Sequence, residues 1–101
     1  MANRLELQTK LEELLGSRNV YYQPPENTKM VYPAIRFTRK DIESRYADGR
    51  IYSKTNCYEI IVISRTPDHP VIDKIMELPY CSFDRHYVSD NLNHDSLTLY
   101  F

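Results

Sequence analysis

The fold of this chain is decided by residues 34–63, which read AIRFTRKDIESRYADGRIYSKTNCYEIIVI. Both ends of the stretch carry β-branched and aromatic residues in partial alternation, which is typical of strands. Between them lies Ala47-Asp48-Gly49, a strong turn signal. The stretch therefore predicts one long antiparallel hairpin.

The base and the tip of this hairpin differ in composition. Folding about the turn pairs apolar residues at the base and polar or aromatic residues near the tip. The predicted pairs are Ile35 with Val62, Phe37 with Ile60, Glu43 with Lys54 and Arg45 with Tyr52; a β-bulge would shift them by one residue. Residues 41–55 are poor in apolar side chains, and each ordered residue costs about 1–2 kcal/mol of backbone entropy. We expect an arm that projects beyond the core and rests on a partner; an unstructured solvent loop is the alternative.

Helix and strand signals precede the hairpin. Residues 4–15 carry a helical stripe formed by Leu7, Leu11, Leu14 and Leu15. Asn3 can cap this helix with Glu6 three residues later, and Gly16 ends it. Residues 20–23 read as a short strand that Pro24-Pro25 terminates.

A second helix and two strands follow the hairpin. We expect Asp68 to cap the helix, Pro70 to lie in its first turn and Pro79 to end it. Its apolar face is formed by Val71, Ile72, Ile75, Met76 and Leu78. Residues 81–89 and 92–101 read as strands joined by a turn at Asp90-Asn91. The order helix, three strands, helix, two strands predicts an α+β fold, with helices on one face of a mostly antiparallel sheet.

Composition narrows the class of protein. The chain has 101 residues, of which 42% are hydrophobic and 27% charged, so we expect a single domain over residues 1–101. The net charge of -1 argues against a general nucleic-acid binder, and we expect no direct sequence-specific contact with nucleic acid. Two distant cysteines indicate free thiols, and no stretch is long and apolar enough for a membrane span. We expect a protein made in the cytoplasm.

Residues 78–94 crowd aromatic and ionisable side chains together, so catalysis has to be considered. Zinc could be held by Cys81, His86 and His94, but their spacing matches no common ligand motif. A nucleophilic site could combine Cys81 and His86 with Asp84 or Asp95, although nothing marks an oriented base or an anion hole. The hairpin carboxylates Asp41, Glu43 and Glu59 could serve a divalent-metal nuclease, but an ion-paired strand surface explains them as well. We expect no catalytic residue, metal or cofactor; a small cytoplasmic metal-dependent enzyme or nuclease is the alternative.

Several short pieces of the chain form an ordered pattern: Tyr22-Gln23-Pro24-Pro25, Tyr32-Pro33-Ala34-Ile35, Tyr46-Ala47-Asp48, Tyr58, residues 78–85, Tyr87 and residues 90–94. Together they resemble a family of small tailed-phage proteins described as tail completion, tail terminator or minor tail proteins. The resemblance implies an α+β virion protein of the tail or neck, with no catalytic residue and no cofactor. It also implies assembly as a homo-oligomeric ring, usually a hexamer, that caps the tail tube and joins it to the head–tail connector. The partners would then be other copies of the chain, the tail-tube protein and the connector protein.

A ring-forming subunit needs exposed edges or arms that a neighbour covers. Tyr and Arg are also enriched at binding hot spots. We therefore expect the interface to draw on the arm and on the aromatic tract near the C-terminus. The candidate interface residues are Arg45, Tyr46, Asp48, Arg50, Tyr52, Arg85, Tyr87, Asp90, Asn91 and His94.

Overall fold

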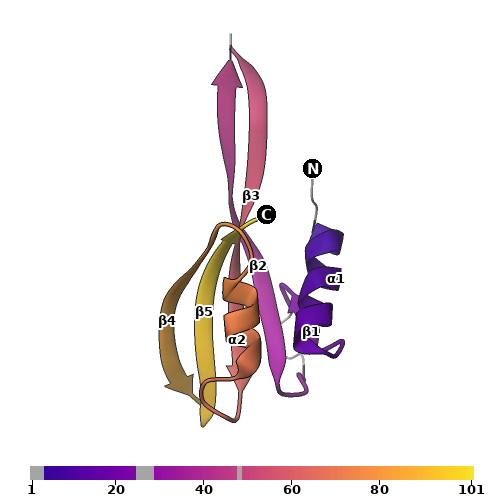
Figure 1. Ribbon diagram of the computed structural model, residues 1–101, viewed down its shortest axis with the longest axis vertical. Coiled ribbons are helices and arrows are strands. Elements are labelled where there is room, and N and C mark those ends of the chain that lie inside the picture. The colour runs from indigo at the N-terminus through magenta and orange to yellow at the C-terminus, as the bar shows by residue number, and fades with distance from the viewer. Residues whose placement is uncertain (1–3, 25–28, 48) are drawn as a thin grey trace.

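A computed structural model of the chain describes residues 4–24, 29–47 and 49–101, and gives the backbone alone for residues 43, 45–47 and 50–54. The elements are α1 (Arg4–Leu15), β1 (Val20–Tyr22), β2 (Ala34–Ala47), β3 (Arg50–Ser64), α2 (Pro70–Met76), β4 (Cys81–Ser89) and β5 (Leu92–Tyr100). The predicted α+β class and the order of the elements are confirmed (Figure 1).

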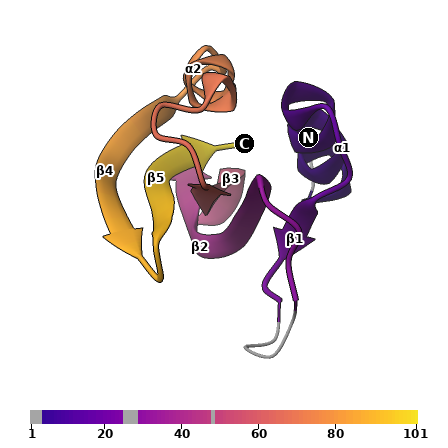
Figure 2. The same cartoon turned by 90° about the horizontal axis from the view of Figure 1, so that it is seen from below.

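The five strands form one sheet in the order β1-β2-β3-β5-β4. Only β1 runs parallel to its neighbour, and the other three pairings are antiparallel. The sheet is curved, and both helices lie on its concave side (Figure 2). Neither α1 nor α2 has the length and the apolar run needed to cross a bilayer.

The core lies between the helices and the sheet, because each element contributes its apolar face to one cluster. Leu7 and Leu11 come from α1, and Val71 and Ile75 come from α2. The sheet contributes buried side chains from four strands: Val20, Ile35, Phe37, Tyr58, Ile60, Val62, Leu97 and Leu99. Gly16 ends α1 as predicted, with a left-handed φ of 81° and its N–H bonded to the carbonyl of Glu12 at 2.9 Å. The proposed cap at Asn3 lies outside the described residues.

The base of the β2–β3 hairpin has the predicted register, but the tip does not. Ile35 lies opposite Val62 and Phe37 opposite Ile60. The register then shifts between Arg39 and Asp41 and shifts back between Arg45 and Tyr46. Lys54 therefore lies opposite Ser44 and Ser53 opposite Arg45, so the predicted pairs of Lys54 with Glu43 and of Tyr52 with Arg45 are wrong. The physical reason is two bulges, each of which inserts one extra residue into one strand.

The cap of α2 also differs from the prediction. His69 is the N-cap, and its Nδ1 accepts a hydrogen bond from the N–H of Val71 at 3.1 Å. Asp68 does not cap the helix: it adopts a left-handed φ of 56°, a conformation that Asp tolerates better than most residues. Pro70 begins the helix, as expected, because its missing N–H needs no partner there. The helix ends at Met76, before Pro79 is reached.

The position of the core can be tested with two isoleucines that lie in strands. Ile60 is fully buried in β3, whereas Ile42 in β2 is 40% exposed. Replacing Ile60 with Ala leaves a cavity, so we expect Ile60→Ala to lower the free energy of unfolding by about 2–5 kcal/mol. We expect Ile42→Ala to change it by about 0.5 kcal/mol or less. Urea unfolding measures both, and equal losses would contradict this placement of the core.

Candidate functional site

The arm is the part of the hairpin that extends beyond the rest of the sheet (Figure 1). The pairing of β3 with β5 ends at Cys57, and that of β2 with β1 ends at Phe37. In the described part of Asp41 to Thr55, the two strands therefore pair only with each other. The molecule measures 51 × 27 × 23 Å, and the arm accounts for the long axis (Figure 1). The described backbone of the arm is a two-stranded ladder with one register shift, between Arg45 and Tyr46, rather than the unstructured loop that was the alternative.

Half of the candidate interface residues belong to this arm. The backbones of Arg45, Tyr46, Arg50 and Tyr52 lie in its distal half. Asp48 lies outside the described residues. Both strands thus carry candidate residues toward the tip, far from the hydrophobic core.

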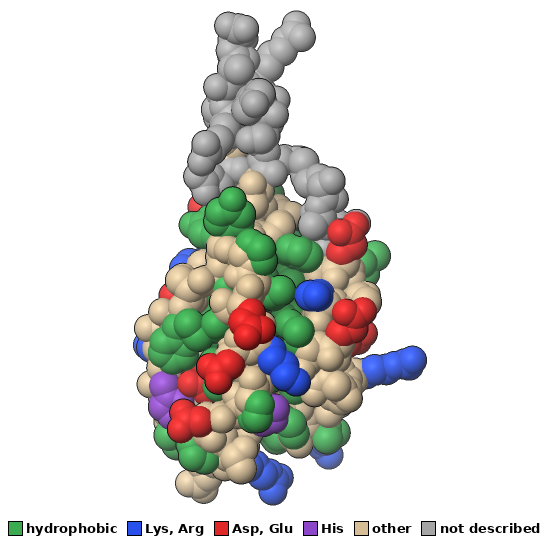
Figure 3. All heavy atoms as spheres, in the orientation of Figure 1, with side chains coloured by type: hydrophobic (Ala, Val, Ile, Leu, Met, Phe, Trp, Pro, Cys, Tyr) green, Lys and Arg blue, Asp and Glu red, His purple; other side chains and the backbone are tan. Residues whose placement is uncertain are grey.

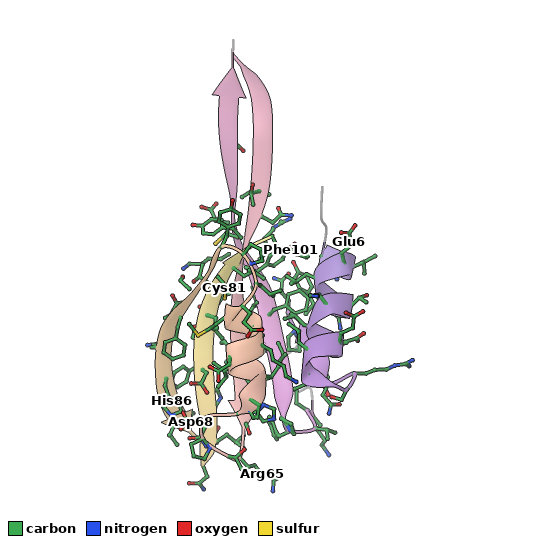
Figure 4. The ribbon with its side chains drawn as sticks, in the orientation of Figure 1. Glu6, Arg65, Asp68, Cys81, His86 and Phe101 are labelled. Atoms are coloured by element: carbon green, nitrogen blue, oxygen red, sulfur yellow. The ribbon has the colours of Figure 1, made fainter. Side chains whose placement is uncertain are left out.

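An apolar pocket of about 290 Å³ lies at the base of the arm. Its walls come from the end of β5, the segment before β4 and the start of the arm: Thr55, Leu78, Pro79, Tyr80, Leu99, Tyr100 and Phe101. Tyr80 has a left-handed φ of 60° and is 82% exposed. The N–H of Phe101 bonds to the carbonyl of Asn56 at 2.9 Å, which fixes the chain end beside the arm (Figure 4). The pocket gives the base of the arm an apolar surface that a partner side chain can enter.

Three other candidate residues form a stack on the face of the sheet away from the helices. The ring of Tyr87 is stacked on that of His94, with centroids 4.8 Å apart and planes inclined by 14°. The guanidinium of Arg85 lies over the same Tyr87 ring at 4.8 Å. Both contacts follow from the β4–β5 register, which places Tyr87 opposite His94. Asp90 and Asn91 form the predicted turn at the end of these strands, both with left-handed φ angles.

The opposite face of β4 forms a groove with α2 that the sequence analysis did not identify. The groove has a volume of about 630 Å³ and contains the hydrogen bond from His86 Nδ1 to Asp95 Oδ1, 2.8 Å long. Its lining consists of Pro67, Asp68, His69, Ile72, Asp73, Met76, Phe83, His86 and Asp95. Folding the chain about the Asp90-Asn91 turn would have placed His86 opposite Asp95, so the sequence held a signal for this pair.

Of the groups considered for catalysis or zinc binding, the structure brings His86 and Asp95 together, but not Cys81 or His94. Cys81 and His86 are five residues apart on β4, which is roughly 16 Å along a strand, and Figure 4 shows them at different heights. His94 lies on the opposite face of the sheet. Among residues 4–24, 29–47 and 49–101, no group of three potential ligands is placed to hold a metal ion.

The surroundings of Cys81 do not favour its use as a nucleophile. Burial raises the pKa of the Cys81 thiol, and the nearby Asp84 carboxylate raises it further. Both effects disfavour the thiolate, which is the reactive form. The His86–Asp95 pair has no Ser, Thr or Cys beside it among the described residues that line the groove.

The structure describes the side chains of Asp41 and Glu59 among the hairpin carboxylates. Asp41 accepts a hydrogen bond from the N–H of Ile42 at 2.8 Å. Glu59 lies between Thr38 of β2 and Thr98 of β5. The side chain of Glu43 lies outside the described residues. What the described residues do offer is a set of surfaces: an arm, an apolar base, an aromatic stack and a groove.

Comparison with family models and with curated protein sequences assigns the chain to no family. No protein-family model matches the chain, and no curated protein sequence matches it. The function therefore has to be argued from these surfaces and from the resemblance carried by the sequence.

The raised pKa of Cys81 gives a pH-dependent prediction. The folded chain keeps this thiol protonated at pH values where the unfolded chain already ionises it, so stability is lost as pH rises above the unfolded pKa. We expect the pH at which Cys81 becomes half-maximally reactive toward iodoacetamide to be higher in the folded chain than in urea.

Mass spectrometry separates Cys81 from the buried Cys57 in this experiment. Asp84→Asn should move the folded midpoint part of the way back, because it removes the nearby negative charge. A folded midpoint below the urea midpoint would show that the thiol is activated rather than suppressed.

Proposed function

We propose that the protein is a tailed-phage structural protein of the tail-terminator or tail-completion type. In this role several copies form a ring, usually of six, on the last ring of the tail tube. The ring stops growth of the tube and offers a docking face to the head–tail connector. The completed assembly is part of the virion, and its subunits are made in the host cytoplasm.

The arm is the observation that carries this proposal. Within residues 41–55, the described backbone forms a two-stranded ladder that pairs with no third strand and lies beyond the core. Ordering such a segment costs about 1–2 kcal/mol per residue in backbone entropy, and its sequence supplies few apolar side chains to offset that cost. Contact with a partner supplies the missing burial, so an arm of this kind fits a subunit that functions in an assembly.

The other surfaces support the same role. The apolar pocket at the base of the arm and the stacked Arg85, Tyr87 and His94 are typical of contact surfaces, where aromatic and Arg side chains are enriched. They lie at different parts of the molecule, as a subunit with more than one partner requires. The net charge of -1 opposes self-association only weakly.

Removing the arm tests the proposal. We expect a chain in which Asn-Gly replaces residues 44–52 to fold but to form no ring, because the core residues lie outside this segment. Light scattering on a size-exclusion column gives the mass, electron microscopy shows rings, and circular dichroism reports the fold.

Leu5→Ser is the matched control, since Leu5 is 65% exposed on α1 and remote from the arm in sequence. It should assemble like the unmodified chain. Rings formed by the armless chain would refute the proposed role of the arm. A gene for a tail-tube protein beside the gene for this chain is the genomic arrangement that we expect.

A further inference from the structure

The side of the molecule formed by α2 and β4 carries exposed apolar side chains. Met76 is 43% exposed, Phe83 42% and Val88 64%. Met76 and Phe83 both line the α2–β4 groove. Neighbouring exposed apolar side chains of this size mark an interaction surface more often than a solvated one.

The same side ends in an open strand edge. β4 is the last strand of the sheet, and within the described part of the chain its outer edge pairs with no other strand. A bulge at Asp84 interrupts the edge, but from Arg85 to Ser89 the strand is regular. Such an edge presents unpaired N–H and C=O groups and therefore favours an extended occupant.

The groove beside this edge is acidic. Asp68, Asp73 and Asp95 line it together with His69 and His86, and no Lys or Arg does so among the described residues. Figure 3 shows acidic, histidine and also Lys or Arg side chains among apolar ones over the lower part of the body. Asp95 accepts a hydrogen bond from His86, but no Lys or Arg of the described lining lies in the groove to pair with Asp68 and Asp73. A basic occupant is therefore favoured.

The arm has the complementary composition. Between Ser44 and Lys54 the sequence carries the cations Arg45, Arg50 and Lys54 against the single anion Asp48. The same segment supplies Tyr46, Ile51 and Tyr52 as apolar and aromatic side chains. An extended, basic and aromatic segment is what an acidic groove with an apolar floor and an open strand edge fits.

From this complementarity we infer that the α2–β4 groove binds the arm of a second copy of the chain. Each subunit then donates one arm and accepts one arm. Cations near the tip lie against Asp68 and Asp73, and aromatic side chains of the arm cover Phe83 and Met76. This inference rests on the assembly role proposed above, and it names the surface that receives the arm.

Photo-crosslinking locates the occupant directly. Benzoylphenylalanine in place of Phe83 puts a photoreactive ring in the groove, and the same residue in place of Leu5 on α1 is the control. After irradiation of the purified full-length chain, we expect the Phe83 position to crosslink to a peptide from residues 41–55 of another copy. The Leu5 position should give no such product. A crosslink from Phe83 to any other peptide, or no crosslink at any soluble concentration, would overturn the inference.

Charge reversal tests the electrostatic part. Asp73→Lys should weaken self-association about tenfold, whereas Glu13→Lys, the same change at an exposed position of α1, should leave it unaltered. In a chain whose arm also carries Arg45→Glu, Arg50→Glu and Lys54→Glu, the effect on self-association should reverse. Asp73→Lys should then strengthen association. Sedimentation velocity measures the affinity, and thermal melting confirms that each variant is folded. If Asp73→Lys changes the affinity in the same direction with the native arm and with the charge-reversed arm, the contact is contradicted.

The assembly role of the arm and its contact with the α2–β4 groove can be refuted separately. If the armless chain loses the ring but the Phe83 crosslink goes elsewhere, the arm acts in assembly and this groove is not its seat. If the armless chain keeps the ring, the assembly role of the arm fails first. Raising the salt from 0.1 to 1 M shortens the screening length from about 10 to about 3 Å. Association that is insensitive to this change would count against the charged contact in either case.

Discussion

The pairing of β3 with β2 is the interaction on which the rest of this structure depends. From Cys57 to Ser64, β3 lies between β2 and β5, and its side chains Tyr58, Ile60 and Val62 are buried under the helices. From Arg50 to Asn56, β2 is the only strand that pairs with β3 among the described residues. One continuous ladder thus provides both the centre of the core and the arm. The bulge between Arg39 and Asp41 lies at the transition from the core to the arm.

Much of the fold follows from signals that lie within a few residues of one another. The leucine stripe of α1, the stop at Gly16, and the turn at Asp90-Asn91 all depend on local backbone preferences, and the structure has each of them. The errors arose where two local solutions compete. Asp68 and His69 can both accept a hydrogen bond at a helix start, and the backbone selected His69. The bulge near Lys40 carries no glycine to mark it, so the register of the tip could not be derived from composition.

Some of the candidate surfaces also follow from local signals in the sequence, whereas the groove does not. The stack of Tyr87 on His94 and the pair of His86 with Asp95 both follow from the turn that joins β4 to β5, so their register could be derived from the sequence. The groove could not, because it requires α2 to lie beside β4 and leave Phe83 uncovered. That arrangement depends on β5 pairing with β3, a contact between segments that lie far apart in the sequence. No pattern within either strand specifies it.

A chain that carries both an arm and a receiving groove can satisfy them in two ways. Two copies can exchange arms reciprocally, which gives a closed dimer, or each copy can pass its arm to the next, which gives a ring when the rotation closes. The face of the sheet away from the helices helps to distinguish the dimer from the ring. Arg85, Tyr87 and His94 lie on the side of the sheet opposite the groove, so an arm seated in the groove leaves them uncovered. In a head-to-tail ring this face repeats once per subunit with a constant orientation, which suits contact with another ring such as the end of a tube. In a reciprocal dimer the two copies of the face are related by a two-fold axis, and that symmetry does not match a polar tube. The proposed place at the end of a tail therefore favours the ring.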